Sequence, residues 1–145
     1  MESTVAPTAQ LPITLGDGLA ALQSGRFDLA ERLARTGLAQ SPADPPWLSV
    51  LALALSQQQR ASDAWPIYEQ LTVLQPKVAE HWSNLGNCLC ELGRERDALA
   101  PLQRALHCGG HGAELHYALA RAWVAHGDAR RALEHVQQAL QTYPQ

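Results

Sequence analysis

The segment Trp82-Ser83-Asn84-Leu85-Gly86-Asn87 decides the fold, because its pattern returns along the chain at a fixed step of 34 residues. Three sets of positions share that step: the alanines Ala30, Ala64, Ala98 and Ala132, the small residues Gly18, Ala52, Gly86 and Ala120, and the turn residues Pro42, Pro76, Gly110 and Pro144. A fixed period of this length indicates an architecture built from structural repeats.

The period divides the chain into units at residues 11–44, 45–78, 79–112 and 113–145. Within a unit, apolar or small residues recur with helical spacing in two separate stretches, so each stretch places them on one face of a helix. Between the stretches, Gly25, Gly93 and Gly127 suit the left-handed residue that ends a helix. Each unit is therefore predicted to fold as a helix, a short turn, a second helix and a further turn.

This pattern resembles the tetratricopeptide repeat, whose signature is Trp-x2-Leu-Gly-x2-Tyr followed by small and aromatic residues at set offsets. The third unit matches best, with Trp82, Leu85, Gly86 and Ala98, although Leu89 replaces the tyrosine. The resemblance covers about nine-tenths of the chain. It implies an all-α fold, a right-handed α-solenoid of four 34-residue helix-turn-helix repeats, in which each repeat contacts only its neighbours.

One structural domain is expected over residues 11–145, preceded by a flexible tail at residues 1–10 that lacks apolar periodicity. The acidic start is not followed by an apolar run, so no secretory signal is expected. No stretch approaches the roughly 18 apolar residues that span a bilayer. The odd number of cysteines, three, favours reduced thiols in a cytoplasmic setting.

The sequence predicts neither a catalytic site nor a bound cofactor or metal. No GxSxG, P-loop, HExxH or GxGxxG motif occurs. The cysteines and histidines match no zinc-binding spacing. Cys88 and Cys108 are interpreted as small buried residues, because Cys88 falls at an inward position of the repeat and Cys108 stands where Leu74 stands one repeat earlier. His116 stands where the third unit has a tryptophan and is interpreted as a packing residue, whereas His126 and His135 are expected to be solvated.

The charge distribution argues against a nucleic-acid partner. Binding to phosphates requires a basic stripe, but the net charge is −3 and the arginines are scattered. Some members of the resembled family bind the C-terminal carboxylate of a chaperone through lysines, arginines and asparagines. Asn84 and Asn87 match asparagine positions of that clamp, but Leu15 and Glu114 stand where lysines are needed, so a chaperone-tail receptor is not predicted.

The resemblance implies that the first helix of each repeat lines a concave groove. Carried onto this chain, the groove residues are Leu15, Leu19 and Leu22 in the first unit, Ser49 and Leu53 in the second, Glu80, Ser83, Asn84, Asn87, Cys90 and Glu91 in the third, and Glu114, Tyr117 and Arg121 in the fourth. Such a groove is apolar in its N-terminal half and polar in its C-terminal half, and it suits an extended peptide or an amphipathic helix. Asn87 is expected to bond a peptide backbone, and Arg121 to pair with a carboxylate. The alternative is that these residues simply face solvent.

Both ends of the repeat array depart from the pattern. In the first unit, Thr14 and Asp17 occupy apolar positions, the leucines form a stripe shifted by one place, and Gly16 and Gly18 each weaken the helix by about 1 kcal/mol. The unit is either an imperfect terminal repeat or a docking stripe for the tail, a second copy or a partner helix.

At the other end, the apolar side of the last repeat, with Leu133, Val136 and Leu140, has no helix to cover it. A terminal repeat without a polar outer face invites association. The chain is therefore expected either to be a fragment of a longer protein or to stack in an oligomer, with the fragment favoured.

Three functions follow from these observations. The leading hypothesis is a non-catalytic module that binds a partner protein or peptide in its groove, with neither nucleic acid nor membrane as a partner. The alternatives are the N-terminal, substrate-recruiting part of a larger sulfotransferase- or glycosyltransferase-like enzyme, and a self-association element. An enzyme active within these 145 residues alone is the least favoured interpretation.

Overall fold

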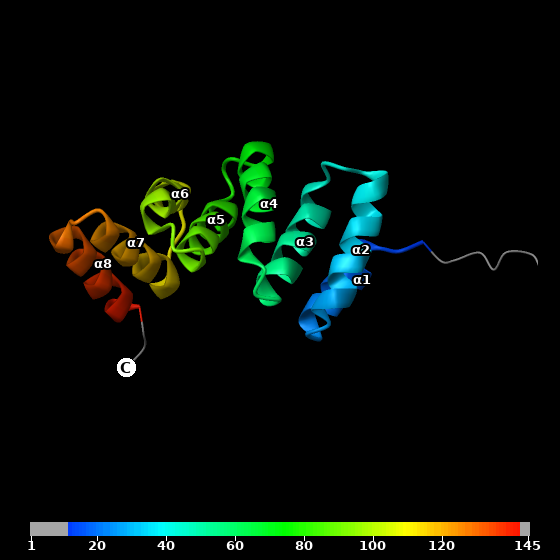
Figure 1. The fold of residues 1–145 in the computed structure, drawn as a ribbon, viewed down its shortest axis with the longest axis horizontal. Helices are drawn as coiled ribbons and strands as arrows, with labels where there is room; N and C mark the ends of the chain where they lie inside the picture. The colour runs from blue at the N-terminus through cyan, green and yellow to red at the C-terminus, as the bar shows by residue number, and fades with distance from the viewer. Residues whose placement is uncertain (1–11, 143–145) are drawn as a thin grey trace, which may run out of the picture.

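A computed structural model describes residues 12–142, which form helices joined by short turns (Figure 1). The helices are α1 (Leu15–Gln23), α2 (Phe27–Gln40), α3 (Pro45–Gln57), α4 (Ala61–Leu74), α5 (Ala79–Glu91), α6 (Glu95–His107), α7 (Ala113–Ala125) and α8 (Ala129–Gln141). No strand occurs within these residues. The predicted tail at residues 1–10 lies outside the described part of the chain.

The helices form a solenoid of four hairpins. Each first helix packs on its own second helix, and each second helix packs on the first helix of the next hairpin, as α2 does on α3, α4 on α5 and α6 on α7. Figure 1 shows the hairpins following one another in a single elongated row from α1 to α8. The all-α repeat solenoid expected from the sequence is confirmed.

The rows of small residues form the seams between the helices. Ala30, Ala64 and Ala98 are fully buried, and Ala132 is buried at 5% exposure. Gly86 lies so close to α6 that a Cβ atom at this position would overlap the side chain of Leu102. The 34-residue period therefore marks the positions where only a small side chain lets two helices pack closely.

The turn inside each hairpin uses a left-handed residue. Gly25, Gly93 and Gly127 have φ angles of 75°, 73° and 79°. The second hairpin places Gln59 at the equivalent position with a φ of 59°. The predicted glycine terminators are confirmed, and the second repeat uses the same turn without a glycine.

The first hairpin is shortened at its beginning. Thr14 is the N-cap of α1, so this helix has nine residues, whereas α3, α5 and α7 have thirteen each. The Thr14 backbone N–H donates to the Asp17 carboxylate at 2.8 Å, and the Asp17 N–H donates to the Thr14 hydroxyl at 3.3 Å. The two polar residues at apolar repeat positions thus form a capping box that starts the helix.

The glycines of the first hairpin accommodate a tryptophan from the second. Trp47, at the start of α3, is 9% exposed. A Cβ atom at Gly18 would lie 2.8 Å from the indole Cζ3, and one at Gly37 would lie 2.6 Å from the indole Cδ2. Gly18 costs helix propensity, but it makes room for a large buried aromatic side chain.

Candidate binding groove

Two adjoining hollows lie over α5 and α7, on the first-helix side of the third and fourth hairpins. One has a volume of about 400 Å³ and the other about 230 Å³, and Asn87 and Glu114 line both. Between them they bring together nine of the predicted groove residues: Glu80, Ser83, Asn84, Asn87, Cys90, Glu91, Glu114, Tyr117 and Arg121. We call these nine residues the C-terminal groove.

Polar and aromatic groups in the C-terminal groove are available for contact. Tyr117 is 61% exposed, whereas Asn84 and Asn87 are half-buried. The hydrogen bonds formed by side chains of residues 12–142 include neither of these two amides. The groove therefore offers an aromatic surface beside two amides that can each donate and accept hydrogen bonds.

Arg121 already has partners within the chain. Its Nη2 donates to a carboxylate oxygen of Glu95 at 3.0 Å and to the carbonyl oxygen of Cys90 at 3.4 Å. Glu95 opens α6 and thereby comes next to α7. A carboxylate from a partner would have to compete with this internal ion pair, which the sequence pattern does not predict.

The cysteines differ in their surroundings. Cys90 is 4% exposed, so it forms part of the floor of the groove rather than its surface, and burial raises the pKa of its thiol. Cys88 is buried as predicted. Cys108 was predicted to be buried but is only half-buried, because it caps the C-terminal end of α6, where its thiol lies 3.5 Å from the carbonyl oxygen of Pro76.

The N-terminal half of the predicted groove is largely part of the core. Leu15 and Leu22 are half-buried and pack against the hydrophobic core, whereas Leu19 is 45% exposed. Ser49 and Leu53 of α3 are half-buried. Of the leucine stripe, Leu19 therefore retains the most surface for contact with another molecule.

A histidine pair joins α7 to α8. The Nδ1 atoms of His116 and His135 lie 3.1 Å apart. His116 is half-buried, as expected for a packing residue. The prediction that His135 is solvated is wrong, because its position on α8 faces α7, and burial followed by the neighbouring His116 lowers its pKa. The equivalent positions in the second hairpin hold Leu48 and Ile67.

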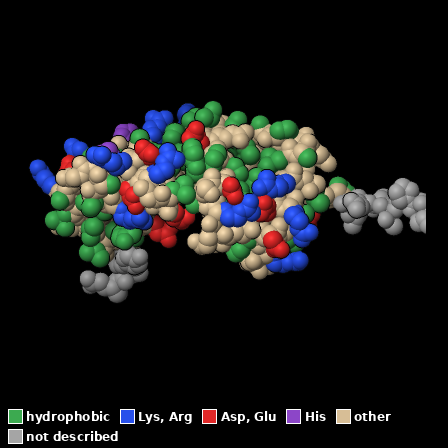
Figure 2. Space-filling model, in the orientation of Figure 1, with side chains coloured by type: hydrophobic (Ala, Val, Ile, Leu, Met, Phe, Trp, Pro, Cys, Tyr) green, Lys and Arg blue, Asp and Glu red, His purple; other side chains and the backbone are tan. Residues whose placement is uncertain are grey.

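The outer side of the last hairpin, with Val124, Leu133, Val136 and Leu140, carries exposed apolar side chains, and we call these four residues the terminal face. Leu133 is 57% exposed and Leu140 is 67% exposed. A hollow of about 560 Å³ lies between α7 and α8 here and is lined by Val124, Leu133 and Val136 among others. Figure 2 shows hydrophobic side chains gathered at the end of the molecule where Figure 1 places α8. The predicted exposure of this side is confirmed.

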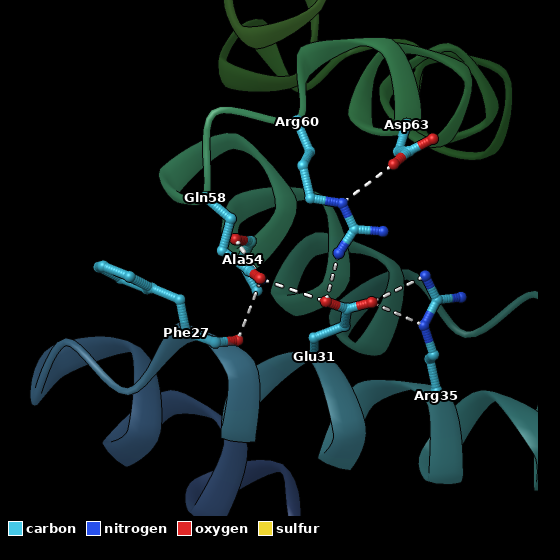
Figure 3. A network of polar contacts seen from close by, with 7 residues as sticks. All are labelled: Phe27, Glu31, Arg35, Ala54, Gln58, Arg60 and Asp63. Carbon is cyan, nitrogen blue, oxygen red and sulfur yellow. Dashed lines mark hydrogen bonds and ion pairs between the residues drawn. The ribbon is translucent and has the colours of Figure 1, made fainter.

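A polar cluster at the junction of the first two hairpins is not predicted by the repeat pattern (Figure 3). Glu31 of α2 accepts hydrogen bonds from Arg60 at 2.8 Å, from Arg35 at 3.0 Å and from Gln58 at 3.2 Å. Burial alone would raise the pKa of Glu31, but these hydrogen bonds and the two guanidinium charges lower it. The cluster ties α2 to the turn between α3 and α4, so we assign it a structural role.

Other kinds of site find no support in the described residues. Between residues 12 and 142, no three His, Cys, Asp or Glu side chains are placed to hold a metal ion. The helices of this same stretch are too short or too polar to cross a bilayer.

Stacked helical hairpins with an open groove define the class of helical-repeat interaction scaffolds. A family model described as tetratricopeptide repeat matches residues 15–65 and 49–113. These matches cover more than half of the chain, which therefore belongs to the tetratricopeptide repeat family.

Similar proteins agree with this assignment. The heat-shock protein cognate co-chaperone sgt12 of Aspergillus fumigatus is 28% identical over 107 residues, which make up 74% of this chain and 31% of that protein. The chain thus spans about a third of that relative's length.

Among solved structures, MamA MSR-1 aligns with a TM-score of 0.77 at 26% identity over 88% of this chain and 74% of that one. A crystal structure of MamA gives a TM-score of 0.80 at 23% identity over 92% of this chain and 77% of that one, a likeness of fold alone.

Proposed function

We propose that this chain is a non-catalytic adaptor that binds a segment of a partner protein in the C-terminal groove. The observation that carries the proposal is the pair of adjoining hollows over α5 and α7, one lined by Asn84 and Asn87 and the other by Asn87 and the exposed Tyr117. Amide side chains can pair with the backbone of an extended peptide, and a tyrosine supplies contact area with a polar tip.

Membership of the tetratricopeptide repeat family supports an interaction role. The relative sgt12 is named a co-chaperone, but we do not extend chaperone-tail binding to this chain, because Leu15 and Glu114 occupy positions where the clamp needs lysines. Three free thiols, two of them buried, agree with a reducing, cytoplasmic setting. The same groove would serve if the chain recruits substrate proteins for a larger transferase.

Affinity capture with matched baits tests this proposal. The baits are the parent chain, the variant Asn87→Ala/Tyr117→Ala, and the control Gln103→Ala, which changes an exposed residue of α6. A protein retained by the parent and the control but lost from the double variant supports binding in the groove. Equal retention on all three baits would show that the groove is not the binding site.

Self-association is a second candidate function, favoured by the terminal face. Leu133 and Leu140 expose apolar surface on the fourth hairpin, and contiguous exposed apolar surface favours association. Light scattering across a concentration series tests it with Leu133→Glu/Leu140→Glu and with the control Val73→Glu, which alters a more exposed apolar residue on α4. An oligomer lost only in the first variant supports this function, and a monomer at all concentrations rejects it.

A further inference from the structure

The C-terminal groove carries an excess of negative charge that its own chain does not balance. Glu80 and Glu91 on α5 and Glu114 on α7 line the two hollows and are exposed. None of the ion pairs formed within residues 12–142 involves these three carboxylates. They therefore face a bound segment as uncompensated charges.

The single cation of the groove does not offset them. Arg121 is the one member of the chain's eleven lysines and arginines that lies on a first helix. Its guanidinium is 3.0 Å from Glu95, so its charge is satisfied within the chain. The remaining lysines and arginines lie on second helices or in turns, and none of them lines either hollow.

Two buried groups, Tyr68 and Cys90, are affected by the charges of these carboxylates. Burial is the main cause that raises the pKa of Tyr68 to about 12. The hydrogen bond with Ser56 opposes the rise, and Cys88, Glu80 and Glu91 each add to it. Burial raises the pKa of the Cys90 thiol, the charge of Arg121 opposes this rise, and the charges of Glu95 and Glu91 add to it. Figure 2 shows acidic side chains gathered on the face of the molecule where Figure 1 places α5 and α7.

We propose that the C-terminal groove selects a basic peptide segment of a partner protein. In such a segment, lysine or arginine residues alternate with residues whose side chains lie along the groove. This inference rests on the proposed function and adds the chemistry of the partner. The amides of Asn84 and Asn87 hold the backbone of the segment, and Glu80, Glu91 and Glu114 receive its cationic side chains. The three carboxylates repel acidic segments, so the same groups that attract one class of partner reject the other.

A selection from random peptides displayed on phage tests this proposal and does not require the natural partner. The full chain is the target, and selections are repeated on Glu80→Gln/Glu91→Gln/Glu114→Gln and on the control Asp28→Asn/Glu69→Gln. The control removes two exposed carboxylates that lie on the second helices α2 and α4 and take part in no ion pair of the described residues. Because all five residues are exposed, both variants are expected to keep the parent's circular dichroism spectrum and melting temperature.

The expected result is that peptides selected on the parent and on the control are enriched in lysine and arginine. A selected peptide, synthesised and labelled, should bind the triple variant about three- to a hundredfold more weakly, as the loss of three exposed ion pairs predicts. Its affinity for the parent should fall with added salt, because surface charges are screened.

Two other outcomes separate this inference from the proposed function. Neutral or acidic peptides that bind the parent and lose affinity for Asn87→Ala/Tyr117→Ala would overturn the basic specificity and leave the groove as the binding site. A selection that yields no peptide dependent on the groove residues would overturn both.

Discussion

The outer surfaces of α2 and α8 occupy the same place in the repeat, but α3 covers the surface of α2, whereas no helix of residues 12–142 covers that of α8. At the first junction, Trp47 of α3 fits against Gly18 and Gly37. At the other end, the equivalent side of α8 presents Leu133 and Leu140 to solvent. The comparison shows that the shared period defines the fold, whereas the residues that depart from the period depend on what each surface packs against.

The largest effect is expected from removing the tryptophan of the first junction. Trp47→Ala replaces a buried indole by a methyl group, and such changes cost about 3–5 kcal/mol of unfolding free energy. Urea unfolding measures it, with Val73→Ala, at a residue 76% exposed, as the control. A loss as small as that of the control would mean that the first hairpin contributes little to the stability of the array.

A pair of glycine substitutions sharpens the comparison within the first hairpin. Gly37→Ala introduces a Cβ atom that overlaps the Trp47 indole, so it should destabilise the protein by about 1–3 kcal/mol. Gly16→Ala is the matched control, because its Cβ atom would meet Thr14 Oγ1 at an ordinary 3.5 Å. Since alanine favours helix, this control should stabilise by about 0.5–1 kcal/mol.

Thermal and urea unfolding of both variants decide the sign of each effect. If Gly37→Ala were as stabilising as Gly16→Ala, the close approach of Trp47 to α2 would be refuted. The prediction depends on geometry rather than on propensity, because both substitutions gain the same helix propensity.

The ion cluster of the first junction predicts a smaller, pH-dependent effect. Glu31→Gln removes the charge that Arg35 and Arg60 share, at a side chain 15% exposed, and should cost about 1 kcal/mol at neutral pH. The folded pKa of Glu31 lies below its ordinary 4.5. The contribution of Glu31 to the free energy of unfolding is therefore complete above pH 4.5 and is lost as the pH falls through the folded pKa.

Urea unfolding of the parent and Glu31→Gln at neutral pH and near pH 3 checks this expectation. The difference between the two proteins should shrink at the acidic pH. A difference that does not change with pH would assign the effect to packing instead of charge.

The sequence predicted the fold because the signal is repeated four times, so that one imperfect unit does not obscure it. It predicted the exposed residues of the terminal face for the same reason: Leu133 and Leu140 fall on the packing side of a repeat. The sequence did not predict contacts between residues that do not recur at the 34-residue period. The capping box of Thr14 belongs to the first unit alone, and the partners of Glu31 occur only at the junction of the first two units.

The candidate groove was predicted unevenly. Its members on α5 and α7 come together, since they occupy the same positions in neighbouring repeats. The pairing of Arg121 with Glu95 was missed, because it depends on the approach of α6 to α7 rather than on spacing along one helix. Leu15 is predicted to line the groove, but it packs against the hydrophobic core and lines neither hollow.

The histidine pair predicts the smallest effect and tests the other end of the comparison. His135 has a folded pKa below its ordinary 6.5, through burial and then through His116. As the pH falls below 6.5, His135 binds a proton more readily in the unfolded chain than in the folded chain. The free energy of unfolding therefore has its full value above this pH and decreases as the pH drops further. Glu134 acts against this trend, because its carboxylate favours the protonated imidazole.

The variant His116→Leu/His135→Ile copies Leu48 and Ile67 of the second hairpin. Its free energy of unfolding in urea should depend less on pH between pH 7.5 and pH 5.5 than that of the parent. Other groups, such as His81, whose pKa is also lowered by burial, account for the pH dependence that remains. If the variant and the parent showed the same pH dependence, the α7–α8 contact would hold no titrating group.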